Sequence, residues 1–178
     1  MERLDIILCM VYYRVNESVI ERQRGVKYSQ ATNYALHTML YFVALPPGTT
    51  IGVQQLAELQ RLSPTYLSKI LTRLVKAGMI SSTPGINGGY KLTRNKADLS
   101  FLEVIHAIEG TASLFQCDDG EDHQGCLIQA VMANAEQQME HYLKERKLIE
   151  LVGQVGDVNA PAGFFLFIVD IKSLQSLL

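Results

Sequence analysis

Ser63-Pro-Thr-Tyr-Leu-Ser-Lys-Ile-Leu-Thr-Arg-Leu-Val-Lys-Ala-Gly-Met-Ile80 is followed at once by Ser81-Ser-Thr-Pro-Gly-Ile-Asn-Gly-Gly-Tyr-Lys-Leu-Thr-Arg94. The first stretch predicts an amphipathic helix, and the second predicts two short strands joined by a glycine-rich tip. A helix followed by such a hairpin is typical of winged helix-turn-helix domains, which place the helix in a DNA groove and the hairpin on the flanking backbone. The sequence therefore predicts a DNA-binding module.

The helix has clear ends and two distinct faces. Ser63 can cap it, Pro64 suits its first turn, and Gly78 is a typical C-terminal stop. Its apolar face recurs every three or four residues, at Leu67, Ile70, Leu71, Leu74 and Val75. The opposite face carries hydroxyls and cations, the groups that meet phosphates and base edges: Thr65, Tyr66, Ser68, Lys69, Thr72, Arg73 and Lys76. A surface helix that meets only water is the alternative, but three cations without an acid favour DNA.

The neighbouring segments complete a winged helix-turn-helix. We predict helices over residues 29–45 and 53–59, with residues 60–62 as the turn before the basic helix. Strands are expected over residues 80–83 and 90–93, and the glycines of residues 85–89 suit a hairpin tip that can approach a phosphate backbone closely. The predicted fold is mainly α with a small β-hairpin wing.

The charge of the chain divides sharply along its length. Its 178 residues carry a net charge of only −2. Residues 27–96, however, hold eight lysines and arginines against one acid, whereas residues 101–150 hold ten acids against three bases. This asymmetry predicts that the first part binds a polyanion and that the second part serves another purpose.

The acidic part predicts a helix over residues 100–109, capped by Ser100 and ended by Gly110, and a longer one over residues 126–151. The longer helix would span roughly 39 Å at 1.5 Å per residue, more than a small domain covers. Two-fold pairing of such helices would bury their apolar stripe and set two recognition helices about one DNA turn (~34 Å) apart. Packing on its own domain is the alternative. The stripe comprises Ile128, Val131, Met132, Ala135, Met139, Tyr142, Leu143, Leu148 and Leu151.

A polar loop between these two helices contains Cys117, His123 and Cys126 in a C-x5-H-x2-C spacing. Thiolate and imidazole groups suit iron or zinc. Two thiols can instead form a reversible disulfide, and an acidic loop without a sensing role is a third interpretation. Four acids lie between the cysteines and would disfavour the thiolate of Cys117: Asp118, Asp119, Glu121 and Asp122.

With these motifs in place, the chain resembles the Rrf-two family of bacterial transcription regulators, which includes IscR, NsrR and CymR. The resemblance covers roughly residues 26–152. It is carried by Lys27-Tyr-Ser, Asn33-Tyr-Ala-Leu36, Gln55-Leu-Ala57, Ser63, Tyr66-Leu67, Lys76-Ala-Gly-Met-Ile80, Gly88-Gly-Tyr-Lys-Leu92, Leu102-Glu-Val-Ile105, Ile108-Glu-Gly110 and the loop from Cys117 to Cys126.

The resemblance implies a homodimeric winged-helix regulator, in most members a repressor, that binds double-stranded DNA. The long C-terminal helix would form the dimer interface, through Ile128, Val131, Met132, Ala135, Met139, Tyr142 and Leu143. The recognition helix and the wing over residues 85–90 would meet the DNA. We expect contacts from Lys27, Tyr28, Ser63, Thr65, Tyr66, Ser68, Lys69, Thr72, Arg73, Asn87, Gly88, Gly89 and Tyr90.

The chain departs from the family pattern at several positions. It has Ser68-Lys69 where the cluster-assembly regulators carry Glu-Gln, and Pro84 where they carry an arginine, so their base preference does not transfer. Cluster-binding members usually have three cysteines, whereas this loop has two, and Gln129 stands where IscR-type proteins place a ligand histidine.

An iron–sulfur cluster would therefore need further ligands from His123, a loop acid or the partner subunit. Cluster-free members respond to other signals, in the CymR case through a partner enzyme. The cofactor and a partner enzyme both stay open at this point.

The family pattern divides the chain into four parts. Residues 1–25 are expected to be an added segment, with Val26 as a candidate start. Residues 26–99 form the DNA-binding domain, residues 100–152 form the sensing loop and dimerisation helix, and residues 153–178 form an apolar tail of unassigned role.

Other classes of protein fit the sequence less well. Three cysteines, no signal-cleavage site and no apolar run near ~18 residues predict a cytoplasmic protein without a membrane partner. The chain shows no nucleotide-binding glycine loop and no nucleophile paired with a base, so we do not expect an enzyme. A winged-helix module that binds a partner enzyme instead of DNA is the second hypothesis, and the basic helix argues against it.

Overall fold

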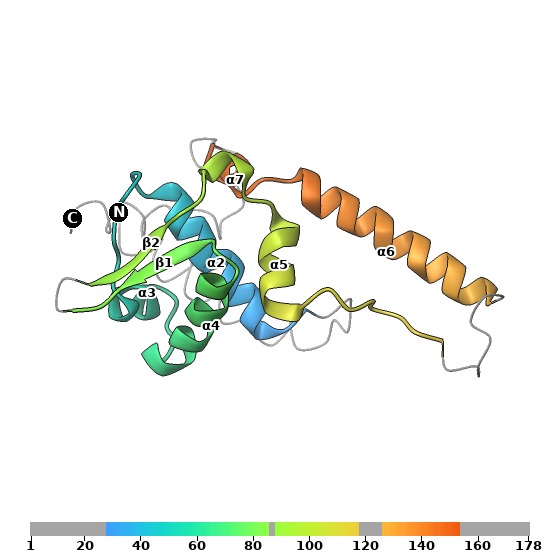
Figure 1. The fold of residues 1–178 in the computed structure, drawn as a ribbon, viewed down its shortest axis with the longest axis horizontal. Helices are drawn as coiled ribbons and strands as arrows, with labels where there is room; N and C mark the ends of the chain where they lie inside the picture. Colours follow the sequence, from blue (N-terminus) through green and yellow to red (C-terminus); the bar gives the residue numbers. More distant parts are fainter. Residues whose placement is uncertain (1–27, 86–87, 118–125, 154–178) are drawn as a thin grey trace, which may run out of the picture.

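The computed structural model describes residues 28–85, 88–117 and 126–153. A body of packed helices carries a hairpin on one side, and a long helix, α6, projects from the other side (Figure 1). Predictions that concern residues 1–25, Lys27, Asn87, His123 and the tail beyond residue 153 lie outside the described residues.

Three helices precede the hairpin, and local sequence signals set their ends. They are α2 (Gln30–Ala44), α3 (Val53–Leu59) and α4 (Pro64–Lys76). Ser29 caps α2 by accepting from the Thr32 amide, and Ser63 caps α4 by accepting from the Tyr66 amide. Gly78 follows α4 at φ 70°, a left-handed conformation that glycine adopts without strain. The predicted starts and stops of these helices are confirmed.

The apolar face of α4 lies in a single core shared with the other helices. Leu67, Leu71 and Leu74 of α4 are fully buried, as are Met39 of α2 and Leu56 of α3. Burial of each such side chain stabilises the folded protein by roughly 1.5–3 kcal/mol. The core therefore fixes the rotation of α4 and leaves its polar face outward.

The hairpin consists of β1 (Ile80–Thr83) and β2 (Gly89–Leu92), paired antiparallel. The second strand begins one residue earlier than predicted because Gly89 pairs with Thr83. Tyr90 also exchanges two backbone hydrogen bonds of 2.9 Å with Ile51, which ties the hairpin to the segment before α3. A Cβ on Gly89 would lie 2.6 Å from the Ile51 carbonyl oxygen, so only glycine permits this close approach.

The acidic part starts with the short 3-10 helix η1 (Lys96–Asp98) and with α5 (Phe101–Glu109). Ser100 and Glu103 form a reciprocal capping box at the start of α5, with bonds of 3.3 and 2.9 Å. Gly110 ends the helix at φ 88°. This helix agrees with its predicted bounds.

The single helix predicted over residues 126–151 is wrong. The structure has α6 (Leu127–Glu145) and a separate short helix, α7 (Leu148–Gly153). Arg146 is extended, and the chain instead bonds to the start of α5, with the Leu148 amide donating to the Leu99 carbonyl at 3.0 Å. Leu148 is thereby buried in the core, and this burial outweighs continuation of the helix. The projecting helix is therefore about 28 Å long at 1.5 Å per residue.

Candidate functional site

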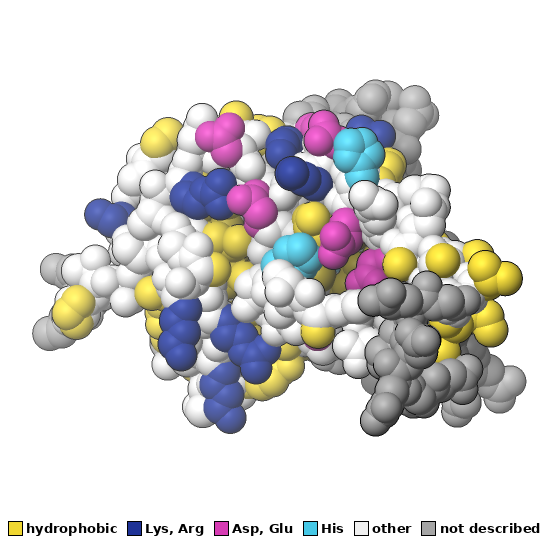
Figure 2. All heavy atoms as spheres, turned by 45° about the vertical axis from the view of Figure 1, so that its right-hand side comes forward, with side chains coloured by type: hydrophobic (Ala, Val, Ile, Leu, Met, Phe, Trp, Pro, Cys, Tyr) yellow, Lys and Arg dark blue, Asp and Glu magenta, His cyan; other side chains and the backbone are white. Residues whose placement is uncertain are grey.

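The outward face of α4 groups the predicted DNA contacts of the recognition helix. Thr65, Tyr66, Lys69, Thr72 and Lys76 are all exposed. Figure 2 shows Lys and Arg side chains in the lower part of the molecule, at the height of α4, with no acidic side chain among them; other Lys and Arg side chains lie higher up, beside the acidic ones. A surface of this kind can attract the phosphate backbone of DNA.

Two of the hydroxyl groups on α4 already donate to backbone carbonyls of the same helix. The Ser68 hydroxyl donates to the Pro64 carbonyl at 2.8 Å, and the Thr72 hydroxyl donates to the Ser68 carbonyl at 2.7 Å. Both can still accept from a base amino group through their remaining lone pairs. The Tyr66 ring packs edge-on against Tyr34, with centroids 6.0 Å apart, which orients its hydroxyl at the start of α4. Lys69 supplies a flexible positive charge beside them.

Arg73, also expected to contact DNA, has an intramolecular partner. Its guanidinium donates from Nη1 to the Ile108 carbonyl at 2.9 Å, at the C-terminal end of α5. A cation at that end also interacts favourably with the helix dipole. Arg73 therefore connects the recognition helix to α5 and to the segment that leads to Cys117.

Glu109 continues this connection to the start of α2. Its carboxylate accepts from the Ser29 amide at 2.8 Å and, at shorter range, from the Thr32 hydroxyl. Burial acts to raise the pKa of Glu109, but the hydrogen bonds from Thr32 and Ser29 and the nearby charge of Arg73 outweigh it, so the pKa is lowered. The carboxylate is therefore stabilised in its charged form.

We expect Glu109→Gln to lower the free energy of unfolding at pH 7 by on the order of 1 kcal/mol, because the amide loses the negative charge at the helix start. The folded-state pKa lies below the unfolded one. The stabilisation is therefore present above the unfolded pKa and is lost as pH falls through the folded value. Urea unfolding between pH 7 and pH 3 should show the two proteins converging in acid. Glu58→Gln, at an exposed position of α3, is the matched control; equal losses in both variants at pH 7 would contradict the assignment.

The described part of the wing contains the positive-φ glycines that its sequence predicted, Gly85 and Gly89. Gly85 has φ 111°, and the Gly88 amide donates to the Gly85 carbonyl at 2.9 Å, which closes the tip. Tyr90 is half-buried against the core, so its ring helps to hold the wing in place. A DNA contact from this residue would use its exposed portion.

Tyr28, another predicted DNA contact, touches α6 instead of the α4 face or the wing. Its hydroxyl reaches the Met139 sulfur on α6 at 3.7 Å. Burial raises the pKa of Tyr28, and the charges of Glu140, Glu109 and Glu136 raise it further. The structure thus joins Tyr28 to the acidic helix rather than to the α4 face.

The projecting helix α6 exposes most of the residues predicted for dimerisation. Ile128 is 63% exposed, Val131 69% and Tyr142 59%, and no residue of α6 is buried. Met139 and Leu143 are half-buried. Figure 2 shows hydrophobic side chains gathered at the right-hand edge of the molecule. Exposed apolar side chains grouped in this way are typical of interaction sites.

The two loop cysteines converge although nine positions separate them. Cys126 caps α6, and its Sγ lies 3.3 Å from Sγ of Cys117. Gln129 makes two bonds to the segment before the loop: its Oε1 accepts from the Cys117 amide at 2.9 Å, and its Nε2 donates to the Phe115 carbonyl at 3.3 Å. This positioning role of Gln129 was not predicted; its place three residues after Cys126 is the one related signal in the sequence.

The described residues do not fit an iron–sulfur cluster by themselves. Such clusters are commonly held by four ligands, and Cys117 and Cys126 supply two sulfurs. No group of three or more His, Cys, Asp or Glu side chains in residues 28–85, 88–117 and 126–153 could hold a metal ion. The amide of Gln129, at the position of the expected histidine, is engaged with the backbone on both sides.

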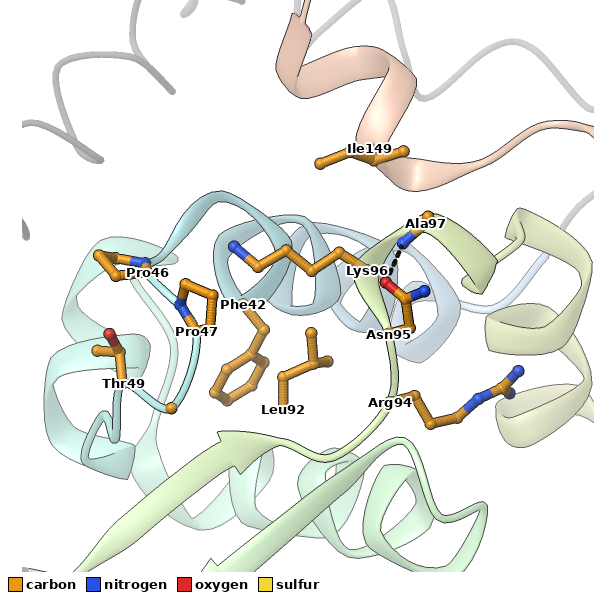
Figure 3. Close-up of a pocket in the computed structure, with 11 residues that line it drawn as sticks. Phe42, Pro46, Pro47, Thr49, Leu92, Arg94, Asn95, Lys96, Ala97 and Ile149 are labelled. Atoms are coloured by element: carbon orange, nitrogen blue, oxygen red, sulfur yellow. Dashed lines mark hydrogen bonds between the residues drawn. The ribbon is translucent and has the colours of Figure 1, made fainter.

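A pocket of about 320 Å³ lies on another part of the molecule, between the end of α2, the segment after β2 and α7 (Figure 3). Phe42, Leu92 and Ile149 contribute its apolar lining. The ammonium group of Lys96 donates to the Leu45 carbonyl, and burial lowers the pKa of Lys96. None of the predicted DNA, metal or dimer residues lines this pocket.

Comparison with known proteins places the chain in a family. The model of the Rrf2 family, described as iron-dependent transcriptional regulators, matches residues 28–154. The chain belongs to the Rrf2 family. YwgB of Bacillus subtilis is 30% identical over 140 residues, which cover 75% of this chain and 88% of YwgB. IscR of Photorhabdus laumondii, an HTH-type transcriptional regulator, is 30% identical over 122 residues, 67% of this chain and 74% of IscR.

Solved structures share the fold of this Rrf2 chain. CymR of Bacillus subtilis aligns with a TM-score of 0.59 at 22% identity and covers 72% of this chain and 98% of CymR. This likeness confirms the predicted winged-helix fold, and the family model confirms the predicted family and the role of a DNA-binding transcription regulator. Among the described residues, no helix is long and apolar enough to cross a membrane.

Proposed function

We propose that this chain acts as a homodimer that binds a two-fold symmetric DNA site and represses transcription there. In each copy, α4 enters the major groove and the β1–β2 wing lies on the flanking backbone. The observation that carries this proposal is the exposed face of α4, where Lys69 and Lys76 stand among hydroxyl groups and no acid. A dimer that occupies a promoter blocks transcription without further machinery.

A second copy of the chain is the partner that best fits α6. The exposed apolar residues recur at three- and four-residue intervals along one side of the helix, as a helix-pairing surface requires. Ile128, Val131 and Tyr142 would be removed from water by the same face of α6 in the other copy, because a two-fold interface uses the same surface patch of both subunits. Most exposed large apolar residues of the described chain lie on α6, so a partner enzyme is not part of this proposal.

The loop around the two cysteines is proposed as the sensing element. Arg73 and the end of α5 connect it to the recognition helix. The sensing element could work through its two thiols alone or through an iron–sulfur cluster. A cluster held by both copies would take further ligands from His123 or a loop acid, and the description of the family as iron-dependent favours it. Bound iron would supply redox chemistry at the two sulfurs.

Selection from a random duplex library tests the DNA-binding proposal. Reduced protein should enrich one sequence composed of two inverted half-sites, and fluorescence anisotropy should give at least a ~1,000-fold preference over scrambled DNA. Enrichment of a single asymmetric site would contradict the dimer. Binding without any sequence preference would contradict the regulator.

A further inference from the structure

The segment after α5 runs outward alongside α6 (Figure 1). Cys117, at the far end of this segment, contacts Cys126 and Gln129 at the start of that helix. Glu136 fixes the middle of the segment. Its carboxylate accepts from the Ser113 hydroxyl at 2.7 Å and from the Leu114 amide at 2.9 Å. Because Glu136 and Gln129 both belong to α6, the path of the segment is set by the helix itself.

This arrangement leaves the sulfur atoms of Cys117 and Cys126 3.3 Å apart. A disulfide bond is about 2.05 Å long, so the sulfurs need to approach by only about 1 Å, within reach of side-chain rotation. Both cysteines are half-buried rather than sealed in the core.

The two thiols are chemically different. Cys126 caps α6, and its sulfur accepts from the Gln129 amide at 3.4 Å. Amides at a helix start favour a thiolate. Cys117 lies outside the described helices and is not a cap residue of α6. Cys126 is therefore the better nucleophile of the pair.

We propose that Cys117 and Cys126 form a reversible intramolecular disulfide, which gives the sensing loop of the proposed regulator a peroxide-responsive dithiol site. This inference rests on the proposed function for its regulatory meaning, but the chemistry needs no metal. Gln129 is a positioning residue for the reaction.

The reaction is balanced with hydrogen peroxide as oxidant. The Cys126 thiol loses its proton, and the thiolate attacks one peroxide oxygen. The O–O bond breaks, Cys126 becomes a sulfenic acid, and the leaving hydroxide takes up the proton lost by the Cys126 thiol to form water. The Cys117 sulfur then attacks the Cys126 sulfur. The S–S bond forms, the S–O bond breaks, and the oxygen leaves as water with the proton of the Cys117 thiol. The two thiols lose two electrons, and the peroxide is reduced to two waters.

The test uses full-length protein carrying Cys9→Ser, treated with a chelator and then with equimolar hydrogen peroxide. Trypsin leaves both loop cysteines in one peptide, residues 97–144, because no Lys or Arg lies between them. After alkylation we expect this peptide to lack both alkyl groups, to be lighter than the dithiol by two hydrogens, and to return to the dithiol with dithiothreitol. A disulfide between two chains, or oxygen added to one cysteine without loss of both thiols, would overturn the proposal.

Two pairs of variants separate chemistry from folding. Cys117→Ser should leave a sulfenic acid on Cys126 that dimedone traps. In Cys126→Ser the remaining thiol, Cys117, should form a dimedone-trapped sulfenic acid at least tenfold more slowly. Gln129→Ala should slow disulfide formation by about tenfold, since small displacements of reacting groups cost at least that much. Gln138→Ala, on the same helix with a bond only to Asn134, is the matched control. Equal rates for Gln129→Ala and Gln138→Ala would contradict the positioning role.

Failure of the disulfide proposal can be distinguished from failure of the proposed DNA-binding function. The disulfide is read by mass, without DNA, whereas the function is read by specific DNA binding of the reduced protein. Failure of the disulfide leaves DNA binding of the reduced protein intact, and failure of DNA binding leaves the mass result intact.

Discussion

Replacing Val131 with Asp is expected to convert the protein to a monomer and to weaken binding to its selected duplex by about 100-fold or more. The side chain is 69% exposed in the isolated chain. In the proposed dimer, however, each introduced carboxylate would be buried in an apolar interface without an opposite charge, which is strongly unfavourable. The loss in DNA affinity follows because two linked recognition helices bind far more tightly than one.

Analytical ultracentrifugation and fluorescence anisotropy measure the two effects together. The matched control is Gln137→Asp, which adds the same charge to α6 at an exposed position on the opposite side of the helix. The control should remain dimeric and bind DNA normally. A dimeric Val131→Asp protein would rule out this face of α6 as the interface.

Replacing Leu74 with Ala is expected to lower the free energy of unfolding by about 3 kcal/mol, through lost burial and the cavity that remains. Leu74 is fully buried in the core that holds α4 against the other helices. The same change should weaken DNA binding at temperatures near the unfolding midpoint, because α4 loses its support.

Urea unfolding at a fixed protein concentration measures this loss. Lys76→Ala, two residues further along α4 at an exposed position, should change stability by less than about 0.5 kcal/mol. A loss below about 1 kcal/mol for Leu74→Ala would mean that α4 is not anchored by this core.

Local signals predicted the DNA-binding half well. Ser63, Pro64 and Gly78 are read directly from the sequence and act within one helix turn, so α4 has the predicted ends. The glycines beside the hairpin tip likewise predicted positive-φ positions, which Gly85 and Gly89 occupy. Each of these features depends on residues that are neighbours in the chain.

The remainder depends on contacts between distant residues. The break at Arg146 arises because Leu148 is buried beside Leu99, and helical periodicity continues through that point in the sequence. Periodicity also assigned Arg73 to the DNA face, although its guanidinium reaches Ile108 on another helix. Composition alone does not reveal such pairs.

The closeness of Cys117 and Cys126 likewise depends on contacts that the sequence does not reveal. The spacing of Cys117 and Cys126 left metal binding, disulfide formation and no role open. The bonds of Gln129 and Glu136 place the two sulfurs together. Those bonds follow from the path of the segment along α6.

If α4 meets the DNA backbone, Lys69→Ala should change the salt dependence of DNA binding. Anisotropy titrations at several salt concentrations give the slope of log Kd against log salt for the wild type, for Lys69→Ala and for Lys144→Ala on α6. Each lost phosphate contact lowers the slope by about 0.9, so a dimer that loses two should show a slope lower by nearly two. Lys144→Ala should match the wild type. An unchanged slope and affinity for Lys69→Ala would contradict the assignment of α4 as the DNA-binding helix.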